Sequence, residues 1–460
     1  MISKNKTLTV FDILMINIVS IVSLKNVSIT SQYGLSIVLI YFVVTVIFLI
    51  PGAIAVSELS TKFLQSGGIS IWINKAFGST VSSYVISMQW IYNIIFFPTI
   101  TVFATTQLSY FISHVVGIDT VFFTSSKIYV TVSALLIFWL GVFINSRGIT
   151  ISSMLSNISA IFGIFLPILL IILLSLGWLL SGHEIELTMQ YLPSNDDNLS
   201  LVIIVFFSLV GIEVAAAHAD RVKDPKRTFP KAIYLSVLIA PILLIFVNLA
   251  IAVVLPSYLI DDRSGLIETF SIFFEKFNLS YMTPAMALVL TIGSFGCLSS
   301  WMLTLSKYLL KIAEYNNLPE IFTVTNKNDV PMNILIMQGI IYSALCLSYL
   351  WMPSIEETYL FLSSLSAQIA LLANAIFFIA AIKLRLNYEW DEAYQFTKNK
   401  YLSIAMFVLG AVGCFLGIVL GFFVVDSSVY LDSINYIVIG GVIIVVLTKL
   451  FVRLFKLKRY

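Results

Sequence analysis

Charged residues are scarce in this chain of 460 residues, at 11% of the composition, whereas hydrophobic residues make up 59%. Soluble domains carry about a quarter charged residues, so the low charge excludes an ordinary water-soluble protein. Short strands of alternating pattern, which an outer-membrane barrel needs, are also missing. Apolar runs of about 18 or more residues recur instead, and each could cross a hydrocarbon core of ~30 Å as a helix. We therefore predict an all-α integral membrane protein.

Cysteine and histidine are almost absent, with three residues of each. Cys297, Cys346 and Cys414 fall inside apolar runs without CxxC spacing, so we expect small buried thiols rather than disulfides or metal ligands. The histidines are far apart in sequence, and no cluster of acids, histidine and nucleophile is evident. Neither an enzyme nor a cofactor or metal site is predicted. Nucleic acid is not an expected partner, because the basic residues follow the loops instead of gathering on one soluble face.

Twelve membrane-spanning helices are predicted, with no soluble domain between them. They fall near residues 8–32, 34–57, 80–113, 127–145, 150–181, 199–218, 231–255, 282–312, 333–352, 356–384, 401–424 and 433–455. With this count, only Lys127, Arg263 and Lys276 lie in loops on one side, Lys25 lies inside a span, and the other basic residues share the side of the N-terminus. Basic residues collect in cytoplasmic loops, so both termini are predicted to be cytoplasmic. Residues 1–455 would then form one transmembrane domain, with 456–460 as a short basic tail.

Two of the predicted spans are poor candidates for continuous helices. The second half of the first span reads "SLKNVSITSQ", and the sixth reads "FFSLVGIEVAAAHADRVKDP". If the two spans correspond, the chain consists of a first repeat of five helices (about 8–181), a second repeat (about 199–384) and a terminal pair (about 401–455). Discontinuous helices at matching positions of two repeats are the best sequence indication of a transporter's binding site.

An unwound turn at mid-membrane exposes helix ends, where N–H groups carry partial positive charge and C=O groups partial negative charge. A carboxylate suits the first and an ammonium the second, so a free amino acid is a suitable ligand for both. The interrupted parts of the two spans, which include Ser23, Asn26 and Gly211, are therefore where we expect a substrate to bind. Phe207, four residues before Gly211, is the residue we expect to lie over the bound substrate.

Lys25 and Glu213 are ionisable residues inside predicted spans. Each costs about 2.5 to 3.5 kcal/mol at the membrane centre and persists mainly when it is used or paired. One interpretation gives them substrate-binding and proton-coupling roles; the alternative is a buried structural ion pair, and a pair that breaks and reforms during transport would combine both. Lys25 could also be a built-in cation whose proton state is coupled to transport. His218 is expected to be structural, with a proton relay to Glu213 as the lesser alternative.

Four segments of the sequence resemble the amino acid–polyamine–organocation transporters, and within them the bacterial glutamate/GABA antiporter branch. They are "SLKNVSITSQYG" with "IPGAIAVSELST", "SGGISIWINKAFG", "GIEVAAAHADRVKDPKRTFPKAI" and "WMLTLSKYLLKIAEYNNLPEIF". The resemblance implies a LeuT-type fold with a five-plus-five inverted repeat in a bacterial inner membrane. It also implies sodium-independent exchange or proton-coupled transport of amino acids. A sensor or scaffold that binds an amino acid without moving it is the alternative from another class.

Carried over by position, the family's unwound segment falls on Ser23, Leu24, Lys25 and Asn26, and its Gly-Ile-Glu motif begins at Gly211. The chain departs from the glutamate/GABA branch in having Lys25 at an aromatic position and Cys297 at an acidic position. Both changes favour an anionic or hydroxyl-rich substrate group over a cationic one. The branch's C-terminal plug has no counterpart here, and oligomeric state is not predicted.

Overall fold

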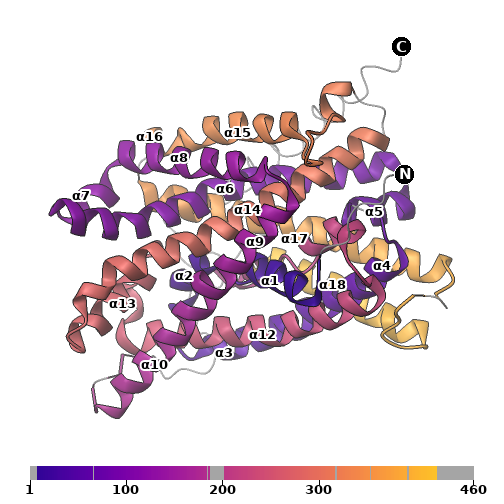
Figure 1. Ribbon diagram of the computed structural model, residues 1–460. Coiled ribbons are helices and arrows are strands. Elements are labelled where there is room, and N and C mark those ends of the chain that lie inside the picture. Colours follow the sequence, from indigo (N-terminus) through magenta and orange to yellow (C-terminus); the bar gives the residue numbers. More distant parts are fainter. Residues whose placement is uncertain are drawn as a thin grey trace.

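The computed structural model describes residues 8–65, 67–183, 185–186, 201–315, 319–352, 354–390 and 393–421. Over these residues the chain is helical, and its only strand-like feature is a single bridge between Leu8 and Val222. The long helices run roughly alongside one another (Figure 1). At one end of the bundle lie α7 (Thr120–Ser125) and α13 (Gly265–Lys276), and at the other lies α5 (Ile69–Phe77). We refer to these as the α13 end and the α5 end.

In the described residues, 10 helical stretches are long and apolar enough to cross a membrane. They are α1 (Val10–Ile21) with η1 (Leu24–Asn26) and α2 (Val27–Ser31), α3 (Ser36–Val44) with η2 (Thr45–Leu49) and α4 (Ile50–Lys62), α6 (Ser79–Val116), α8 (Lys127–Asn145), α9 (Ile149–Ala160) with η3 (Ile161–Phe165) and α10 (Leu166–Leu180), α12 (Pro225–Val254), η7 (Ser280–Met282) with α14 (Thr283–Tyr315), α15 (Met332–Cys346) with α16 (Ser348–Trp351), α17 (Ile355–Asn387) and α18 (Lys400–Leu420). The prediction of an all-helical, multi-pass membrane protein is confirmed.

The predicted sixth span is divided into two short helices. These are α11 (Val202–Ser208) and η5 (Val214–Arg221), and residues 209–213 between them are not helical. The predicted twelfth span and the basic tail lie outside the described residues, so the count of twelve stays a prediction.

The first span is interrupted near its middle, as its polar residues predict. The helix α1 begins with a capping box in which Thr9 and Asp12 satisfy each other's backbone N–H groups, and it ends at Ile21. Val22 and Ser23 follow in non-helical conformation, and the chain then turns through η1 into α2. Both predicted discontinuous helices are therefore present.

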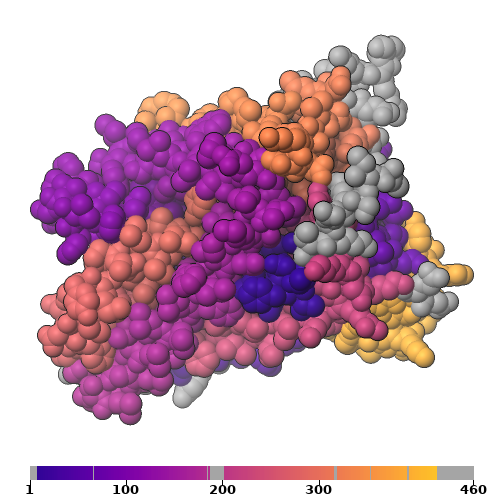
Figure 2. Space-filling model, viewed as in Figure 1, coloured from indigo at the N-terminus to yellow at the C-terminus, as the bar shows by residue number. Residues whose placement is uncertain are grey.

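The broken first span and the longest helices form the centre of the bundle. In the most apolar window of α6, 94% of the residues are buried, against 33% in α18, so α6 is central and α18 peripheral. α14 and α17 both pack against α6, and α1 packs against α9 and α12. In Figure 2, α9 and α10 cross the face in magenta, and only a small indigo patch of the first span is visible.

Glycine allows two of these helices to touch through their main chains. A Cβ atom added at Gly163, in the π-helical turn η3, would lie 2.2 Å from the Cα atom of Gly293 in α14. A side chain at either position would separate the helices. Close approach through small residues is a common way to pack helices in membranes, where lipid already solvates apolar side chains.

We expect Gly211→Ala to destabilise the fold by about 1 to 3 kcal/mol, because φ is 128° at this residue and a Cβ atom would lie 3.0 Å from the Ser20 carbonyl oxygen. Thermal unfolding of the purified protein in detergent measures this loss. Gly78→Ala is the matched control, since φ there is also positive, at 86°, but no atom lies within 4 Å of the added Cβ. Equal losses in the two variants would contradict the close contact at Gly211.

Candidate functional site

The two interrupted spans lie against each other at their breaks. The main chain at Gly211 passes the Ser20 carbonyl so closely that a Cβ atom would lie 3.0 Å from its oxygen. The Asn26 side-chain amide donates a hydrogen bond of 2.9 Å to the Ser208 hydroxyl, which joins the start of α2 to the end of α11. Non-helical backbone at membrane depth is tolerated only where protein or a cavity surrounds it. The breaks therefore mark the place where a cavity is expected.

A narrow cavity, which we call the central cavity, lies at this meeting point. Its lining comes from both broken spans, from α6 and from α14: Ser20, Ser23, Asn26, Tyr92, Asn93, Phe96, Phe207, Val210 and Trp301. The Ser23 hydroxyl and the Asn26 amide oxygen are buried there, and neither has a hydrogen-bond partner among the described residues. Buried polar atoms are almost always hydrogen-bonded, so the two atoms are available to a polar ligand.

A second narrow cavity lies beside it, and Ser23 lines both. The first span, α6, η3 and α14 surround it through Val22, Ser23, Leu24, Lys25, Ile100, Ile164, Gly293, Ser294 and Cys297. The predicted residues thus divide between two spaces. Asn26 and Phe207 line the central cavity, whereas Lys25 and Cys297 line the second.

The Lys25 side chain is fully enclosed, with 1% of its surface exposed. Its ammonium group donates a hydrogen bond of 3.2 Å to the Ser363 hydroxyl of α17. Three aromatic rings surround it, with centroids at 5.2 Å for Phe96, 5.8 Å for Phe207 and 5.3 Å for Tyr359. Cation–π attraction at such distances contributes about 2 kcal/mol when the cation is desolvated, which offsets part of the cost of burial.

Glu213 does not pair with Lys25. No ion pair of Lys25 occurs in the part of the chain that the structure describes, so the interpretation as a buried Lys25–Glu213 pair is not supported in this conformation. Glu213 is 2% exposed and lies just before η5, where the Tyr308 hydroxyl donates a bond of 3.4 Å to its carbonyl. Its carboxylate atom Oε1 has no hydrogen-bond partner among the described residues. Gly211 and Glu213 line neither cavity and instead shape the break beside them.

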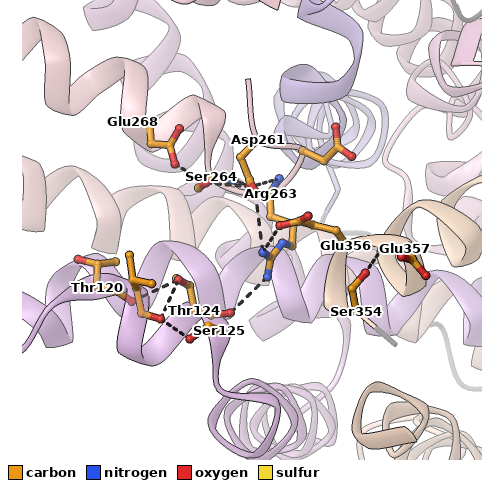
Figure 3. Close-up of polar contacts among 12 residues, drawn as sticks. Thr120, Thr124, Ser125, Asp261, Arg263, Ser264, Glu268, Ser354, Glu356 and Glu357 are labelled. Carbon is orange, nitrogen blue, oxygen red and sulfur yellow. Dashed lines mark hydrogen bonds and ion pairs between the residues drawn. The ribbon is translucent and has the colours of Figure 1, made fainter. Parts of the chain in front are cut away.

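Residues 261–266, which we call the cap segment, cover the site at the α13 end. The Arg263 guanidinium donates to the Glu356 carboxylate at the start of α17 (2.9 Å) and to the Thr124 carbonyl of α7 (3.4 Å), as Figure 3 shows. Gln107 of α6 donates to the Arg263 carbonyl at 3.0 Å. The Leu266 N–H donates to the Ser28 hydroxyl of the first span at 3.2 Å. The cap segment therefore connects the first span, α6, α7 and α17.

The acids of the cap segment have opposite pKa shifts. Burial, together with repulsion from Asp261, raises the pKa of the Asp262 carboxyl to about 6, although a hydrogen bond of 2.9 Å from Gln32 opposes the shift. Burial also disfavours ionisation of Asp261, but attraction to Arg263 and hydrogen bonds from Ser264 outweigh it and hold the pKa of Asp261 below its usual value. Protonation at mildly acidic pH therefore concerns Asp262 first.

The loop before α5 covers the opposite side of the site. The Gly67 N–H donates to the Ala217 carbonyl of η5 at 3.2 Å, and Leu8 bridges Val222 directly after η5. The site is thus covered at the α5 end as well as at the α13 end.

Two pairs of polar side chains join the end of η5 to its neighbours. The Lys307 ammonium donates to Nδ1 of the buried His218 at 3.0 Å, which fits the structural role expected for this histidine. Arg221 forms an ion pair with Asp329.

Several site residues were not predicted from the sequence. They are Tyr92, Asn93, Phe96 and Trp301 in the central cavity and Tyr359 and Ser363 beside Lys25. Tyr92 and Phe96 are four residues apart and share one face of α6, and this spacing was the one signal that could have indicated them.

Comparison with known proteins agrees with this geometry. A family model described as amino acid permease matches residues 7–446. The chain is 34% identical to an uncharacterized transporter of Legionella pneumophila over 96% of each protein. It is 26% identical to a glutamate/gamma-aminobutyrate antiporter of Lactococcus lactis over 64% of this chain and 59% of that protein, and 23% identical to a cadaverine/lysine antiporter of Escherichia coli over 82% and 81%.

The structure resembles that of MhsT in complex with L-phenylalanine. The TM-score is 0.64 at 13% identity, with 91% of this chain and 100% of that chain covered. At this identity the likeness shows the fold alone. The predicted LeuT-type fold is confirmed.

We expect Glu356→Gln to loosen the cap segment, because it removes an ion pair whose arginine side chain is 9% exposed and whose glutamate is 54% exposed. A partly exposed pair contributes about 1 kcal/mol, so the open state should become roughly fivefold more populated. The rate at which a small thiol reagent modifies the buried Cys297 in detergent, followed by mass spectrometry, reports this change. Glu357→Gln makes the same charge change one residue later, away from Arg263, and should leave the rate unaltered.

The pKa of Asp262 predicts that the folded state loses stability as pH rises. The folded carboxyl, with a pKa of about 6, holds its proton at pH values where the unfolded carboxyl, at 3.8, has released it. The free energy of unfolding should therefore fall between about pH 4 and pH 6.5, by the order of 2 kcal/mol. Thermal unfolding across this range tests the sign. Asp262→Asn should flatten the profile, while Glu275→Gln, an exposed acid of α13, should not.

Proposed function

The chain belongs to the amino acid permease family and is an amino acid transporter of the membrane, and from this premise we propose that it is a sodium-independent antiporter that works by alternating access. The observation that supports the proposal most is the central cavity where the two broken spans meet. Relatives named as antiporters support exchange over one-way transport. A proton-coupled permease is the second candidate, because Glu213 is buried and its Oε1 atom has no hydrogen-bond partner in the described part of the chain.

The proposed substrate contacts are the helix ends at the two breaks. The α1 helix directs its last carbonyl groups toward the break, and these would bind the α-ammonium group of an amino acid. The first N–H groups of η1 would bind its α-carboxylate. The Ser23 hydroxyl and the Asn26 amide oxygen line the same cavity and would complete these contacts.

Lys25 supports an acidic or polar amino acid as the substrate. An ammonium group has three donors, and in the described residues one of them is directed at Ser363. The others could bind the side-chain carboxylate or hydroxyl of a substrate that reaches past Ser23 from the central cavity. Phe207 lines that cavity and packs edge-to-face on Phe96 with ring centroids 5.4 Å apart, so a rotation of its side chain would close or open the space above the substrate.

Alternating access would consist of opening the two covered ends in turn. Release of Arg263 from Glu356 and Thr124 would expose the site at the α13 end, and separation of the loop before α5 from η5 would expose it at the other. We propose that the α5 end faces the cytoplasm of a bacterium, because most basic residues of the sequence belong to that side. The moving units would be the two five-helix repeats, about 8–181 and about 199–384, with the terminal pair outside them.

Counterflow in proteoliposomes tests the function. Vesicles are loaded with each of a panel of acidic, polar, neutral and basic amino acids, and uptake of the labelled compound is followed without sodium at two pH values. We expect saturable uptake of an acidic or polar amino acid that requires substrate on the opposite side. Lys25→Ala should reduce it by about tenfold to a hundredfold, which corresponds to the loss of a hydrogen bond to a charged group. Lys276→Ala, an exposed lysine of α13, is the control.

The same assay separates the candidates. Uptake that needs a pH gradient instead of internal substrate, and that loses its pH dependence in Glu213→Gln, would favour the proton-coupled permease. Unchanged specificity in Lys25→Ala would remove Lys25 from the substrate site. Binding of an amino acid without any uptake would return the chain to the sensor interpretation and contradict transport.

A further inference from the structure

The rings around Lys25 are held in place by contacts that do not involve its ammonium group. The Tyr359 hydroxyl donates a hydrogen bond of 2.9 Å to the backbone carbonyl of Lys25, which fixes the tyrosine relative to the main chain. Phe96 and Phe207 pack edge-to-face, and Phe207 also packs on Tyr92 with centroids 6.5 Å apart. All three rings are buried, at 3%, 8% and 0% exposure for Phe96, Phe207 and Tyr359. The arrangement of rings is therefore expected to survive loss of the lysine side chain.

Three ring faces around one buried ammonium form a recognisable kind of site. Aromatic cages bind organic ammonium groups, because each ring face attracts a cation and the rings exclude water. Here the ammonium also has a hydroxyl acceptor in Ser363, as a bound amine would. A buried lysine ordinarily requires a carboxylate, yet in the described chain the partners of this ammonium are rings and a hydroxyl.

We infer that Phe96, Phe207, Tyr359 and Ser363 form a binding site for a primary organic ammonium group, which the protein fills with its own Lys25. The inference rests on the proposed function, because it explains how a transporter with a cation-binding cage in its substrate region excludes cationic substrates. Lys25 would act twice: its head group occupies the cage, and its charge repels amines and attracts carboxylates. An empty cage would make the same fold an amine-binding protein.

Lys25→Ala provides a direct test, because the atoms it removes, Cγ, Cδ, Cε and Nζ, correspond to n-propylammonium. The second cavity, which Lys25 itself lines, adjoins the space that the substitution creates. Purified wild-type protein and Lys25→Ala are heated in detergent over a range of n-propylammonium concentrations. We expect the amine to raise the unfolding midpoint of the variant at concentrations at least about tenfold lower than any that affect the wild type.

Matched variants and ligands distinguish recognition of a cation by the rings from filling of an apolar cavity. n-Propanol has the same chain length without the charge and should stabilise Lys25→Ala at least tenfold less well. Lys25→Met refills the space without a charge and should not respond to the amine. Lys25→Ala combined with Tyr359→Leu should need about tenfold more amine than Lys25→Ala alone, since one ring face is lost. Lys25→Ser repeats the test if the alanine variant does not fold, and recovery of either folded variant only when the amine is present would also support the cage.

Any of three results would overturn the inference. The first is a folded Lys25→Ala or Lys25→Ser protein that n-propylammonium does not stabilise beyond the wild type. The second is equal stabilisation by n-propanol, and the third is stabilisation by the amine that is unchanged by Tyr359→Leu. Binding in detergent requires no transport, so this outcome is independent of counterflow. If the amine does not stabilise the variant but counterflow shows exchange, only the cage inference is contradicted. If the amine stabilises the variant but counterflow shows no exchange, only the proposed transport function is contradicted.

Discussion

Every feature of the site follows from the need to satisfy backbone polar groups inside a bilayer. Lipid offers no hydrogen-bond partner, so a chain that crosses it remains helical except where other protein groups or a cavity surround it. The first and sixth spans break the helix at the same place in space, and α6, α14 and α17 enclose the breaks. The central helix α6 is nearly all buried because it covers this unwound backbone, whereas α18 lies at the periphery and is mostly exposed. The cavity and the packing around it are thus one solution to a single constraint.

The same constraint explains how a lysine can remain at membrane depth. The Lys25 ammonium is removed from lipid by three ring faces and one hydroxyl, which come from α6, the sixth span and α17. Removing a charge from water without a counter-charge is expensive, and the rings offset only part of the cost. The part of this desolvation cost that the rings do not offset favours binding of an anion beside Lys25. The absence of an acid beside Lys25 in the described residues is therefore consistent with a substrate that supplies the negative charge.

Part of this site could be predicted from the sequence, for a definite physical reason. Polar residues and Gly211 inside apolar runs show where a helix cannot continue, because helix formation depends mostly on nearby residues. The burial of the three thiols and the interruption of the sixth span were likewise predicted from neighbouring residues in the sequence. The partners of Lys25 could not be predicted: a pair with Glu213 was one alternative because it carries the opposite charge, but Ser363 is 338 residues away in the sequence and reaches Lys25 only through packing. Tyr92 and Phe96 resemble the many other aromatic residues of the chain until the helices are assembled.

The contact between Gly163 and Gly293 has a consequence for the mechanics of the bundle. Helices that interlock through long side chains must separate before they can turn, and each separation exposes gaps that cost energy. Two bare main chains present a smooth surface, so a change of tilt between η3 and α14 would leave the distance between their axes nearly constant at this contact, while hydrogen bonds of Ser156 and Ser159 hold the preceding helix α9 to α14. The contact borders the second cavity, which Gly293 lines. Rocking about this point would displace the helices most at the two ends of the bundle and least beside the bound substrate, because displacement grows with distance from the pivot.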